Sequence, residues 1–255
     1  MESGCARSDG EGWVVYPAID LRGGRVVRLA QGDPDAETEY ADDPARVARR
    51  WRDAGASWAH VVNLDGAFGE GGRENLAALG PIVAAGLAVQ FGGGLRDLGA
   101  MRQVLEAGAA RLVVGTAAVQ DPALLEAALE AFGPERVALA IDSRRGRVRT
   151  HGWQREALLT PAELGRTWVE RGIRWIIFTD VDRDGMGSGL NLEATTALAR
   201  ETGAHVIASG GVATLDDVRR SRCAGLSGVI IGRALYEGHI ALRDALRVGE
   251  GDDVG

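Results

Sequence analysis

The sequence contains an internal repeat, and this feature constrains its fold more than any other. The stretch "AIDLRGGRV" at residues 18–26 returns as "AIDSRRGRV" at residues 140–148, with seven of the nine positions identical. Residues 44–65 also align with residues 161–182, and residues 93–117 with residues 210–234, both at a spacing of 117 and without a gap. A spacing that holds over two long blocks indicates duplication, so the chain consists of two copies of a unit of about 120 residues.

Each half alternates between short runs rich in β-branched residues and longer stretches with helical periodicity. The predicted strands cover residues 14–19, 58–64, 87–91 and 111–115 in the first half, and 137–141, 175–179, 205–209 and 228–232 in the second. The clearest helical stretches are residues 44–55, 95–108 and 121–132. Eight strands, each followed by a helix, predict an α/β fold of the (β/α)8 TIM barrel type, built from two duplicated (β/α)4 half-barrels. A doubly wound open sheet is the alternative.

The repeat also sets the expected boundaries. We expect a single barrel domain over residues 12–247, with half-barrels at about 12–133 and 134–247, and flexible tails at residues 1–11 and 248–255. The repeat spacing decreases from 122 to 117 between Val26 and Pro44, which places five extra residues there. This segment is long and polar, and long loops in compact domains are usually lids or binding loops.

Composition excludes several classes of function. The net charge of −7 and the pI of about 5.2 argue against nucleic acid or an acidic membrane surface as a partner. The sequence has no apolar run long enough to span a membrane, and residues 1–11 lack the apolar core of a secretory signal. Cys5 and Cys223 match neither a zinc motif nor a disulfide framework. We therefore expect a cytoplasmic protein with free thiols that acts on a small molecule as a monomer.

Glycine-rich turns follow four of the predicted strands, in "FGGGLRD", "VGTAAVQDP", "ASGGVATLDD" and "IGRALYEG". Glycine lets the backbone approach an anion closely, and the N–H groups at a helix start point toward it. The loops after strands 7 and 8 form the usual phosphate site of a TIM barrel, and the repeat predicts a second site across the barrel mouth. The predicted residues are Gly210, Gly211, Gly232 and Arg233 for the first site, and Gly93, Gly94, Gly115 and Thr116 for the second. Two opposed sites predict a bis-phosphate substrate, although tight turns would also explain the glycines.

Two aspartates stand at equivalent strand ends of the halves. Asp20 and Asp142 are expected to face each other across the barrel mouth, between the two phosphate sites. Two carboxylates that flank a substrate can divide the work of acid and base if their environments separate their pKa values. A metal site is the competing interpretation, but it needs more converging carboxylates or histidines than these strand ends offer. We therefore predict acid/base chemistry and no metal.

Aromatic and histidine side chains add a candidate ring-binding position. Trp153, in "HGWQ", follows the fifth predicted strand, where its ring can stack on a flat substrate ring or serve as a structural anchor. His60 and His205 lie within or at the start of predicted strands and are expected to be structural, and His239 lies near the last helix. His151 is the histidine in a plausible substrate loop. Two pairs of tryptophans recur across the repeat and are expected to pack in the core.

Several motifs together resemble a known family. They are "PAIDLRGGRVVRLAQGD", "VVNLDGAFGEGG", "FGGGLRD", "VGTAAV", "AIDSRRGRV", "HGW", "FTDVDRDGMGSGLNL" and "ASGGVATLDDV". From about Trp13 to Leu246 the chain resembles the ProFAR isomerase family of histidine biosynthesis (the phosphoribosyl isomerase A type). The resemblance implies a half-barrel-duplicated (β/α)8 enzyme that performs an Amadori rearrangement of an aminoaldose to an aminoketose. Its substrate, phosphoribosylformimino-aminoimidazole carboxamide ribotide (ProFAR), carries two phosphates.

The resemblance also implies roles for single residues. Asp20 would be the general base that takes the proton from C2, and Asp142 the general acid that helps open the furanose ring. Thr179, with Asp180 beside it, would assist in positioning and proton relay. Arg28 would reach the substrate from the long first loop. The family implies no metal and no organic cofactor.

Three other functions stay open at the level of the sequence. A bifunctional actinobacterial type also acts on phosphoribosylanthranilate in tryptophan biosynthesis; the motifs "RLAQGD", "TEY" and "AFGEGG" resemble it, but it carries an arginine where this chain has His151. The imidazole-glycerol-phosphate cyclase shares the doubled barrel and works with a glutaminase partner, but usually has a Cys-Leu-Asp type motif in place of "PAID". A non-catalytic sugar-phosphate binder would not need both aspartates. We expect the histidine-pathway isomerisation to be the main activity, with the tryptophan-pathway reaction weak or absent.

Overall fold

The computed structural model describes residues 12–29, 33 and 36–252 of the 255-residue chain. The expected N-terminal tail, residues 1–11 with Cys5, lies outside the described residues, as do residues 253–255. At the C-terminus, helix α11 (Leu242–Glu250) continues past the boundary expected at residue 247. Val248 is buried on the inner face of this helix. The folded domain therefore extends to about Glu250, because the apolar face of α11 continues that far.

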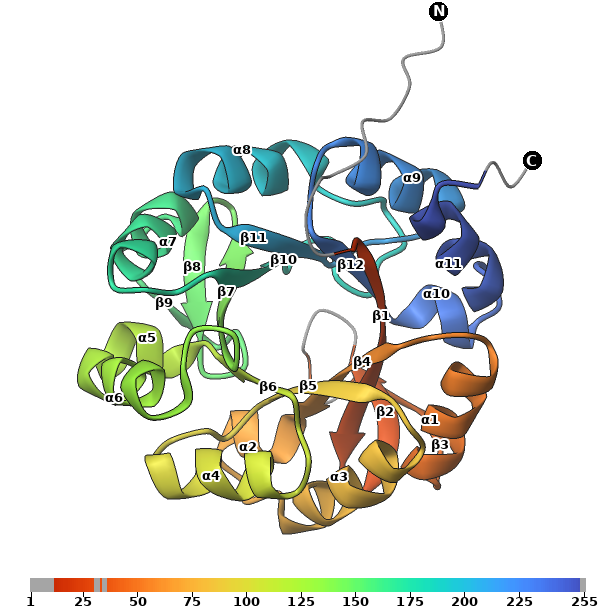
Figure 1. The fold of residues 1–255 in the computed structure, drawn as a ribbon, viewed down its shortest axis with the longest axis horizontal. Helices are drawn as coiled ribbons and strands as arrows, with labels where there is room; N and C mark the ends of the chain where they lie inside the picture. Colours follow the sequence, from red (N-terminus) through yellow and green to blue (C-terminus); the bar gives the residue numbers. More distant parts are fainter. Residues whose placement is uncertain (1–11, 30–32, 34–35, 253–255) are drawn as a thin grey trace, which may run out of the picture.

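Eight parallel strands form a closed ring with helices around it (Figure 1). The ring is closed because the first strand pairs with the last as well as with the second. In order around the ring the strands are β1 (Val14–Arg22), β4 (Trp58–Asn63), β5 (Ala88–Gly92), β6 (Arg111–Val114), β7 (Val137–Arg144), β10 (Trp175–Asp180), β11 (His205–Ser209) and β12 (Gly228–Ile231). The predicted TIM barrel is confirmed, and the open doubly wound sheet is wrong because these strands leave no open edge.

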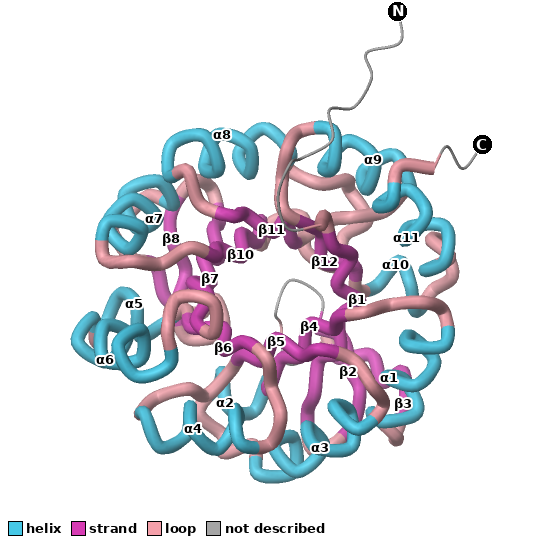
Figure 2. The backbone as a smooth tube through the Cα atoms, in the orientation of Figure 1, coloured by secondary structure: helices cyan, strands magenta, loops and turns pink. Residues whose placement is uncertain are grey.

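The helices cover the outer face of the ring (Figure 2). The longer helices are α1 (Pro44–Asp53), α3 (Arg73–Ala84), α4 (Leu98–Glu106), α6 (Pro122–Phe132), α7 (Pro161–Glu170), α8 (Leu192–Thr202), α9 (Leu215–Cys223) and α11. Three short helices follow strand ends: α2 (Leu64–Phe68), α5 (Thr116–Gln120) and α10 (Arg233–Tyr236). Trp51 and Trp168, which are equivalent in the repeat, are both buried between helices and barrel, as expected. In the described part of the chain no helix is long and apolar enough to cross a bilayer.

Each half carries a short antiparallel extension after its first strand. β2 (Arg25–Leu29) and β3 (Glu37–Ala41) extend β1, and β8 (Arg147–Thr150) and β9 (Arg155–Glu156) extend β7. The segment expected to be a long polar loop is therefore largely a β-hairpin, although residues 30–32 and 34–35 lie outside the description. Val26 and Val27 explain the difference, because both are buried and require a packed strand.

The N-terminal end of the barrel interior is filled by an arginine between two tryptophans. The guanidinium of Arg111 lies 3.9 Å from the ring centroid of Trp175 and 5.0 Å from that of Trp58. The two tryptophans are equivalent in the repeat, and Trp175 also stacks on His205. Cation–π contact and apolar burial therefore occupy this end of the barrel, which leaves the C-terminal ends of the strands for chemistry.

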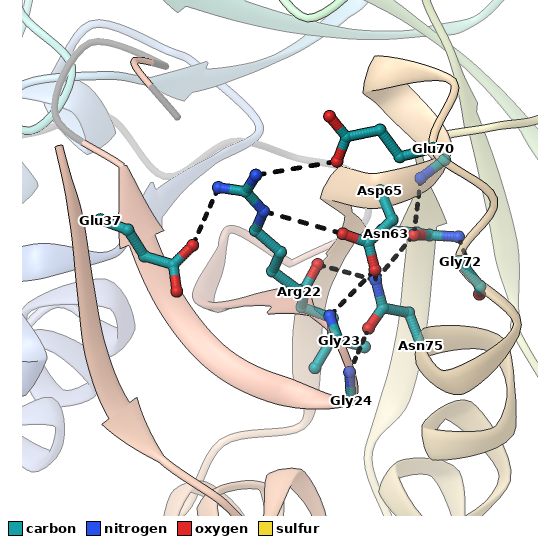
Figure 3. A network of polar contacts seen from close by, with 11 residues as sticks. Arg22, Gly23, Gly24, Glu37, Asn63, Asp65, Glu70, Gly72 and Asn75 are labelled. Carbon is teal, nitrogen blue, oxygen red and sulfur yellow. Dashed lines mark hydrogen bonds and ion pairs between the residues drawn. The ribbon is translucent and has the colours of Figure 1, made fainter. Parts of the chain in front are cut away.

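A buried asparagine ties two loops of the first half together (Figure 3). Asn75, on α3, is 0% exposed, and its amide nitrogen lies 2.8–2.9 Å from the Leu21 carbonyl oxygen, Asn63 Oδ1 and Asp65 Oδ2. Its Oδ1 accepts from the backbone N–H of Gly24 at 2.8 Å. One side chain therefore joins the β1–β2 turn to the loop after β4.

An arginine extends this network to the hairpin. Arg22 donates to Glu37 of β3 at 2.9 Å and lies 3.9 Å from Asp65 and 3.7 Å from Glu70 (Figure 3). The second half repeats part of the arrangement. There Arg144 lies 3.4 Å from Asp182, the residue equivalent to Asp65.

Substitution of Asn75 tests how much this network contributes to stability. Asn75→Ala should lower the free energy of unfolding by about 2–3 kcal/mol, because it leaves several buried polar groups unpaired. The asparagine that binds the equivalent strand end of the second half is Asn191, which is partly exposed. Asn191→Ala should remove a helix cap and one hydrogen bond to Asp180, about 1 kcal/mol. Urea unfolding of both variants measures the difference. Equal losses would show that burial of the network does not matter.

Candidate active site

A cavity of about 620 Å³ opens at the C-terminal ends of the barrel strands. This volume is within the usual range for a small-molecule site. Residues of both halves line it, including the catalytic candidates Asp20, Asp142 and Thr179, the binding candidates Arg28, Gly93, Gly94, Gly115, Thr116 and Trp153, and in addition His60, Arg96, His151 and Asp184. Nine of the predicted site residues therefore line one cavity, and the two aspartates share it as expected.

Asp20 is held by a half-buried cation. Arg28, on β2, donates to Asp20 Oδ2 and to Asp184 Oδ1, at 2.5 Å in each case. Burial by itself lowers the pKa of Arg28, but the charges of Asp184 and Asp20 outweigh burial and raise this pKa above its ordinary value. The guanidinium is thus a permanent positive charge between two carboxylates. Burial also raises the pKa of Asp184, against the opposing effect of Arg28.

Asp142 has a different environment. It lies opposite the half that carries Asp20, and no cation is among the groups that shift its pKa. Burial raises the pKa of Asp142 to about 6, although hydrogen bonds from the Thr179 hydroxyl and the Trp153 indole favour the carboxylate, and the nearby charge of Asp184 raises it further. Strand register places Thr179 directly beside Asp142. A carboxyl group with such a pKa can give a proton near neutral pH.

Asp180 is not part of this cavity, which corrects the prediction that it assists Thr179. Successive residues of a strand face opposite sides, so Asp180 points away from the barrel interior when Thr179 points into it. Asp180 accepts from Asn191 Nδ2 at 2.6 Å and from the backbone N–H of Asp182 at 3.1 Å. Its counterpart Asn63 accepts from an asparagine in the same way. Asp180 is therefore a structural residue that holds the start of α8.

The second predicted phosphate position lies within the main cavity. Gly93 and Gly94 follow β5, and Gly115 and Thr116 begin the turn into α5. The hydroxyl oxygen of Thr116 accepts from the backbone N–H of His151 at 3.0 Å. Arg96, which the sequence analysis did not single out, lines the same end of the cavity and supplies a positive charge there.

The first predicted phosphate position lies in an adjoining cavity of about 220 Å³. Gly210, Gly211, Gly232 and Arg233 all line it. Arg28 and Asp184 line both cavities, so their ion pair stands at the boundary between them. Arg233 donates to Glu237 Oε1 at 2.7 Å and to the carbonyl oxygen of Gly185.

Packing accounts for some of the glycines. A Cβ atom at Gly93 would lie 2.1 Å from the carbonyl oxygen of Asn63, and one at Gly210 would lie 2.6 Å from that of Asp180. Both glycines also have positive φ angles, of 94° and 86°. Close packing of loops therefore requires glycine at these two positions whether or not an anion binds. The anion-binding role of the two clusters stays a prediction.

Trp153 and three unpredicted residues complete the site. The Trp153 backbone has a φ of 71°, unusual for a non-glycine residue, and its indole donates to Asp142 rather than lying free for stacking. His60, expected to be structural, lines the cavity. Asp184 pairs with a residue 156 positions away, a contact that no local pattern indicates. The motif "FGGGLRD" contained the signal for Arg96, a cation beside a glycine turn.

The groups that this site offers for chemistry are carboxyl groups and hydrogen-bond donors. Among the described residues, no group of three or more histidine, cysteine, aspartate or glutamate side chains is arranged to hold a metal ion. Two carboxyl groups with different partners, Asp20 beside an arginine and Asp142 beside hydroxyl and indole donors, are suited to proton transfer on opposite sides of a bound molecule.

Known proteins resemble this chain over nearly its whole length. Residues 14–241 match the family model described as "Histidine biosynthesis protein". A protein of Dinoroseobacter shibae is 48% identical over 238 residues, covering 92% of this chain and 98% of that protein. Relatives in Moorella thermoacetica (46% identical, 94% and 100% covered) and Syntrophomonas wolfei (45%, 93% and 98%) are similar. All three are named 1-(5-phosphoribosyl)-5-((5-phosphoribosylamino)methylideneamino) imidazole-4-carboxamide isomerase.

The raised pKa of Asp142 predicts a pH-dependent loss of stability. A carboxyl group with a higher pKa in the folded state binds its proton more tightly there. Its stabilising effect is complete below the ordinary pKa of 3.8 and is lost as the pH rises through about 6. Asp142→Asn does not titrate, so the unfolding free energy of the wild type should fall relative to this variant by about 2–3 kcal/mol over that range. Urea unfolding at a series of pH values measures the change, and a constant difference would contradict it.

The two glycine clusters predict two anion positions. Crystals soaked in phosphate should show one anion near Gly94 and Thr116 and another near Gly211 and Arg233, because backbone N–H groups and local cations converge at both places. The absence of an anion near Gly94 and Thr116 would contradict the argument from the repeat.

Proposed function

The chain belongs to the histidine biosynthesis protein family, and from this membership and the geometry of the cavity we propose that it is the isomerase that converts ProFAR to its phosphoribulosyl aminoketose. ProFAR is the imidazole carboxamide compound in the names of the relatives. The observation that carries the proposal is the pair of aspartates, Asp20 and Asp142, in one cavity between two glycine-rich ends. The reaction is an Amadori rearrangement, an internal aldose–ketose isomerisation by acid/base catalysis.

Proton transfers by the two carboxyl groups account for the reaction. Asp142 gives a proton to the ring oxygen, which opens the furanose and leaves a protonated imine at C1. Asp20 then takes the proton from C2, and the electron pair of that bond moves toward the nitrogen to give an enolamine. C1 gains a proton and the C2 hydroxyl loses one, which leaves the ketone. The oxidation of C2 balances the reduction of C1, so the reaction needs no external oxidant or cofactor.

Substrate binding draws on both ends of the site. We assign one phosphate to the glycine cluster with Thr116 and Arg96, and the other to the cluster with Gly211 and Arg233. These local donors explain how a protein of net charge −7 can bind a doubly phosphorylated anion. Arg28, between the two cavities, is placed to contact the sugar that joins them.

We propose that the enzyme works as a monomer in the cytoplasm. Both aspartates and both glycine clusters come from one chain, which supports a monomer as the working unit. A bis-phosphate does not cross membranes unaided, so we place the enzyme in the cytoplasm, where such compounds are made. The names of the relatives give no support to activity on phosphoribosylanthranilate, nor to the cyclase reaction or simple sugar-phosphate binding.

Asp20→Asn tests the base. Turnover of ProFAR by this variant should fall by about 100-fold or more in kcat, with a much smaller change in KM, because general base catalysis is lost while the shape of the site is kept. Asp180→Asn is the matched control, since it places at this strand end the residue that the first half has there, Asn63. It should keep more than about a third of wild-type kcat. An Asp20→Asn enzyme with more than half of wild-type kcat would overturn the assignment.

A second measurement separates the histidine-pathway reaction from the bifunctional alternative. We expect kcat/KM for ProFAR to exceed that for phosphoribosylanthranilate by more than tenfold, because His151 is a poorer carboxylate partner than the arginine of the bifunctional type. Loss of anthranilate fluorescence reports the second reaction. Efficiencies within tenfold of each other would show a bifunctional enzyme.

A further inference from the structure

His60 is a buried histidine that the two-aspartate reaction does not use. It lies in β4, with 9% of its surface exposed, and its side chain lines the main cavity. In the sheet it pairs with Ala18 of β1, two residues before Asp20 on the same face of that strand. The imidazole is therefore next to the proposed base.

A neighbouring glutamine determines which ring nitrogen carries the proton. Gln90, 0% exposed and paired with His60 in the sheet, places its amide nitrogen 3.1 Å from His60 Nδ1. We assign the proton to Nε2, because the amide nitrogen that faces Nδ1 can only donate and leaves Nδ1 as the acceptor. Nε2 has no hydrogen-bond partner within the described part of the chain, and it is the nitrogen left to face the cavity.

The imidazole is neutral under working conditions. Burial lowers the pKa of His60 to about 4, and Arg28 lowers it further, while Asp20 acts in the opposite direction. The ring is therefore a donor without a positive charge at neutral pH, and it does not compete with Arg28 for Asp20 as a cation would.

The repeat shows that packing does not require this polar pair. The positions equivalent to His60 and Gln90 in the second half are Ile177 and Ile207, which pair in the sheet in the same way and are buried. The first half instead buries an amide oxygen, Gln90 Oε1, for which the described residues offer no partner. An unpaired buried acceptor destabilises the folded state. A polar pair kept in one half at this cost, beside one aspartate only, indicates a role in chemistry.

We propose that His60 is a catalytic residue whose Nε2–H donates a hydrogen bond to the substrate oxygen on the carbon that Asp20 deprotonates. The proposal rests on the isomerase function proposed above. Negative charge develops on this oxygen as the C2 hydroxyl loses its proton to become the carbonyl, and a neutral imidazole can stabilise such an oxygen. His60 keeps its own proton throughout, so the proton balance of the reaction does not change.

Three variants separate this role from a structural one. His60→Asn keeps a polar group near the position of Nδ1 for Gln90 but removes the donor at Nε2. His60→Gln places an N–H near the position of Nε2 but weakens the contact with Gln90. The double variant His60→Ile with Gln90→Ile copies the pair of the second half and should be at least as stable as the wild type to urea.

The expected pattern is a loss of kcat without a loss of stability. His60→Asn and the double variant should lose about 100-fold in kcat for ProFAR with KM within about threefold, while His60→Gln should retain about tenfold more activity than His60→Asn. The proposal is overturned if the double variant is stable and keeps kcat within threefold of wild type. It is also overturned if activity follows stability across the three variants.

Nitrogen-15 NMR of the wild-type protein tests the tautomer without any variant. The chain has four histidines, so assignment is tractable. His60 should show a protonated Nε2 and an unprotonated Nδ1 from about pH 6 to pH 8. A proton on Nδ1, or a charged ring at pH 7, overturns the proposal. Failure of the wild type to convert ProFAR would instead overturn the isomerase function, and the NMR result would still report the state of His60.

Discussion

The centre of the site depends on one half-buried arginine, Arg28. Arg28 binds Asp20 and Asp184 at once, and two carboxylates this close would repel each other without a cation between them. Removing one partner of a buried ion pair is far more damaging than replacing the whole pair, because a charge is left without compensation. The position of Arg28 depends in turn on the hairpin β2–β3, which the ion pair between Arg22 and Glu37 ties to the end of β1. Loss of the β2–β3 hairpin would therefore also remove the positive charge of Arg28 from beside Asp20.

Different neighbours give the two repeated aspartates different chemistry. The residue equivalent to Arg28 in the second half is Thr150, so Asp142 has no cation at the corresponding position. Burial without a cation raises the pKa of Asp142 to about 6, whereas Asp20 is in an ion pair with a guanidinium. In the proposed reaction Asp142 can therefore hold a proton to give to the substrate, and Asp20 is placed to accept a different proton from it. A duplication supplies two identical carboxylates, and substitutions around them separate acid from base.

The sequence predicted the barrel but not the hairpin after its first strand, and only part of the site. Periodicity and the repeat were sufficient for the barrel, because each strand and helix must bury a regular apolar face. The predicted strand ended at Thr179, whereas β10 continues to Asp180, so the alternation that points Asp180 outward was not applied to it. Asp184 was missed because its role comes from a contact with Arg28 across 156 residues. His60 was taken for a structural residue, since a histidine inside a strand gives no sign of the cavity that it faces.

Comparison of the halves distinguishes structural positions from positions that serve the reaction. Both halves must connect a strand end to the following helix, so they use the same contacts there: Asn63 and Asp180 each accept from an asparagine. A substrate without two-fold symmetry meets different parts of the two halves, so selection on binding and chemistry can change one copy alone. A position where the halves share a contact is therefore structural, as at Asp180. Other positions carry a polar side chain in one half and an apolar one in the other, as His60 and Ile177 do. We interpret such a position as one that serves the reaction, because the substrate contacts the two halves differently.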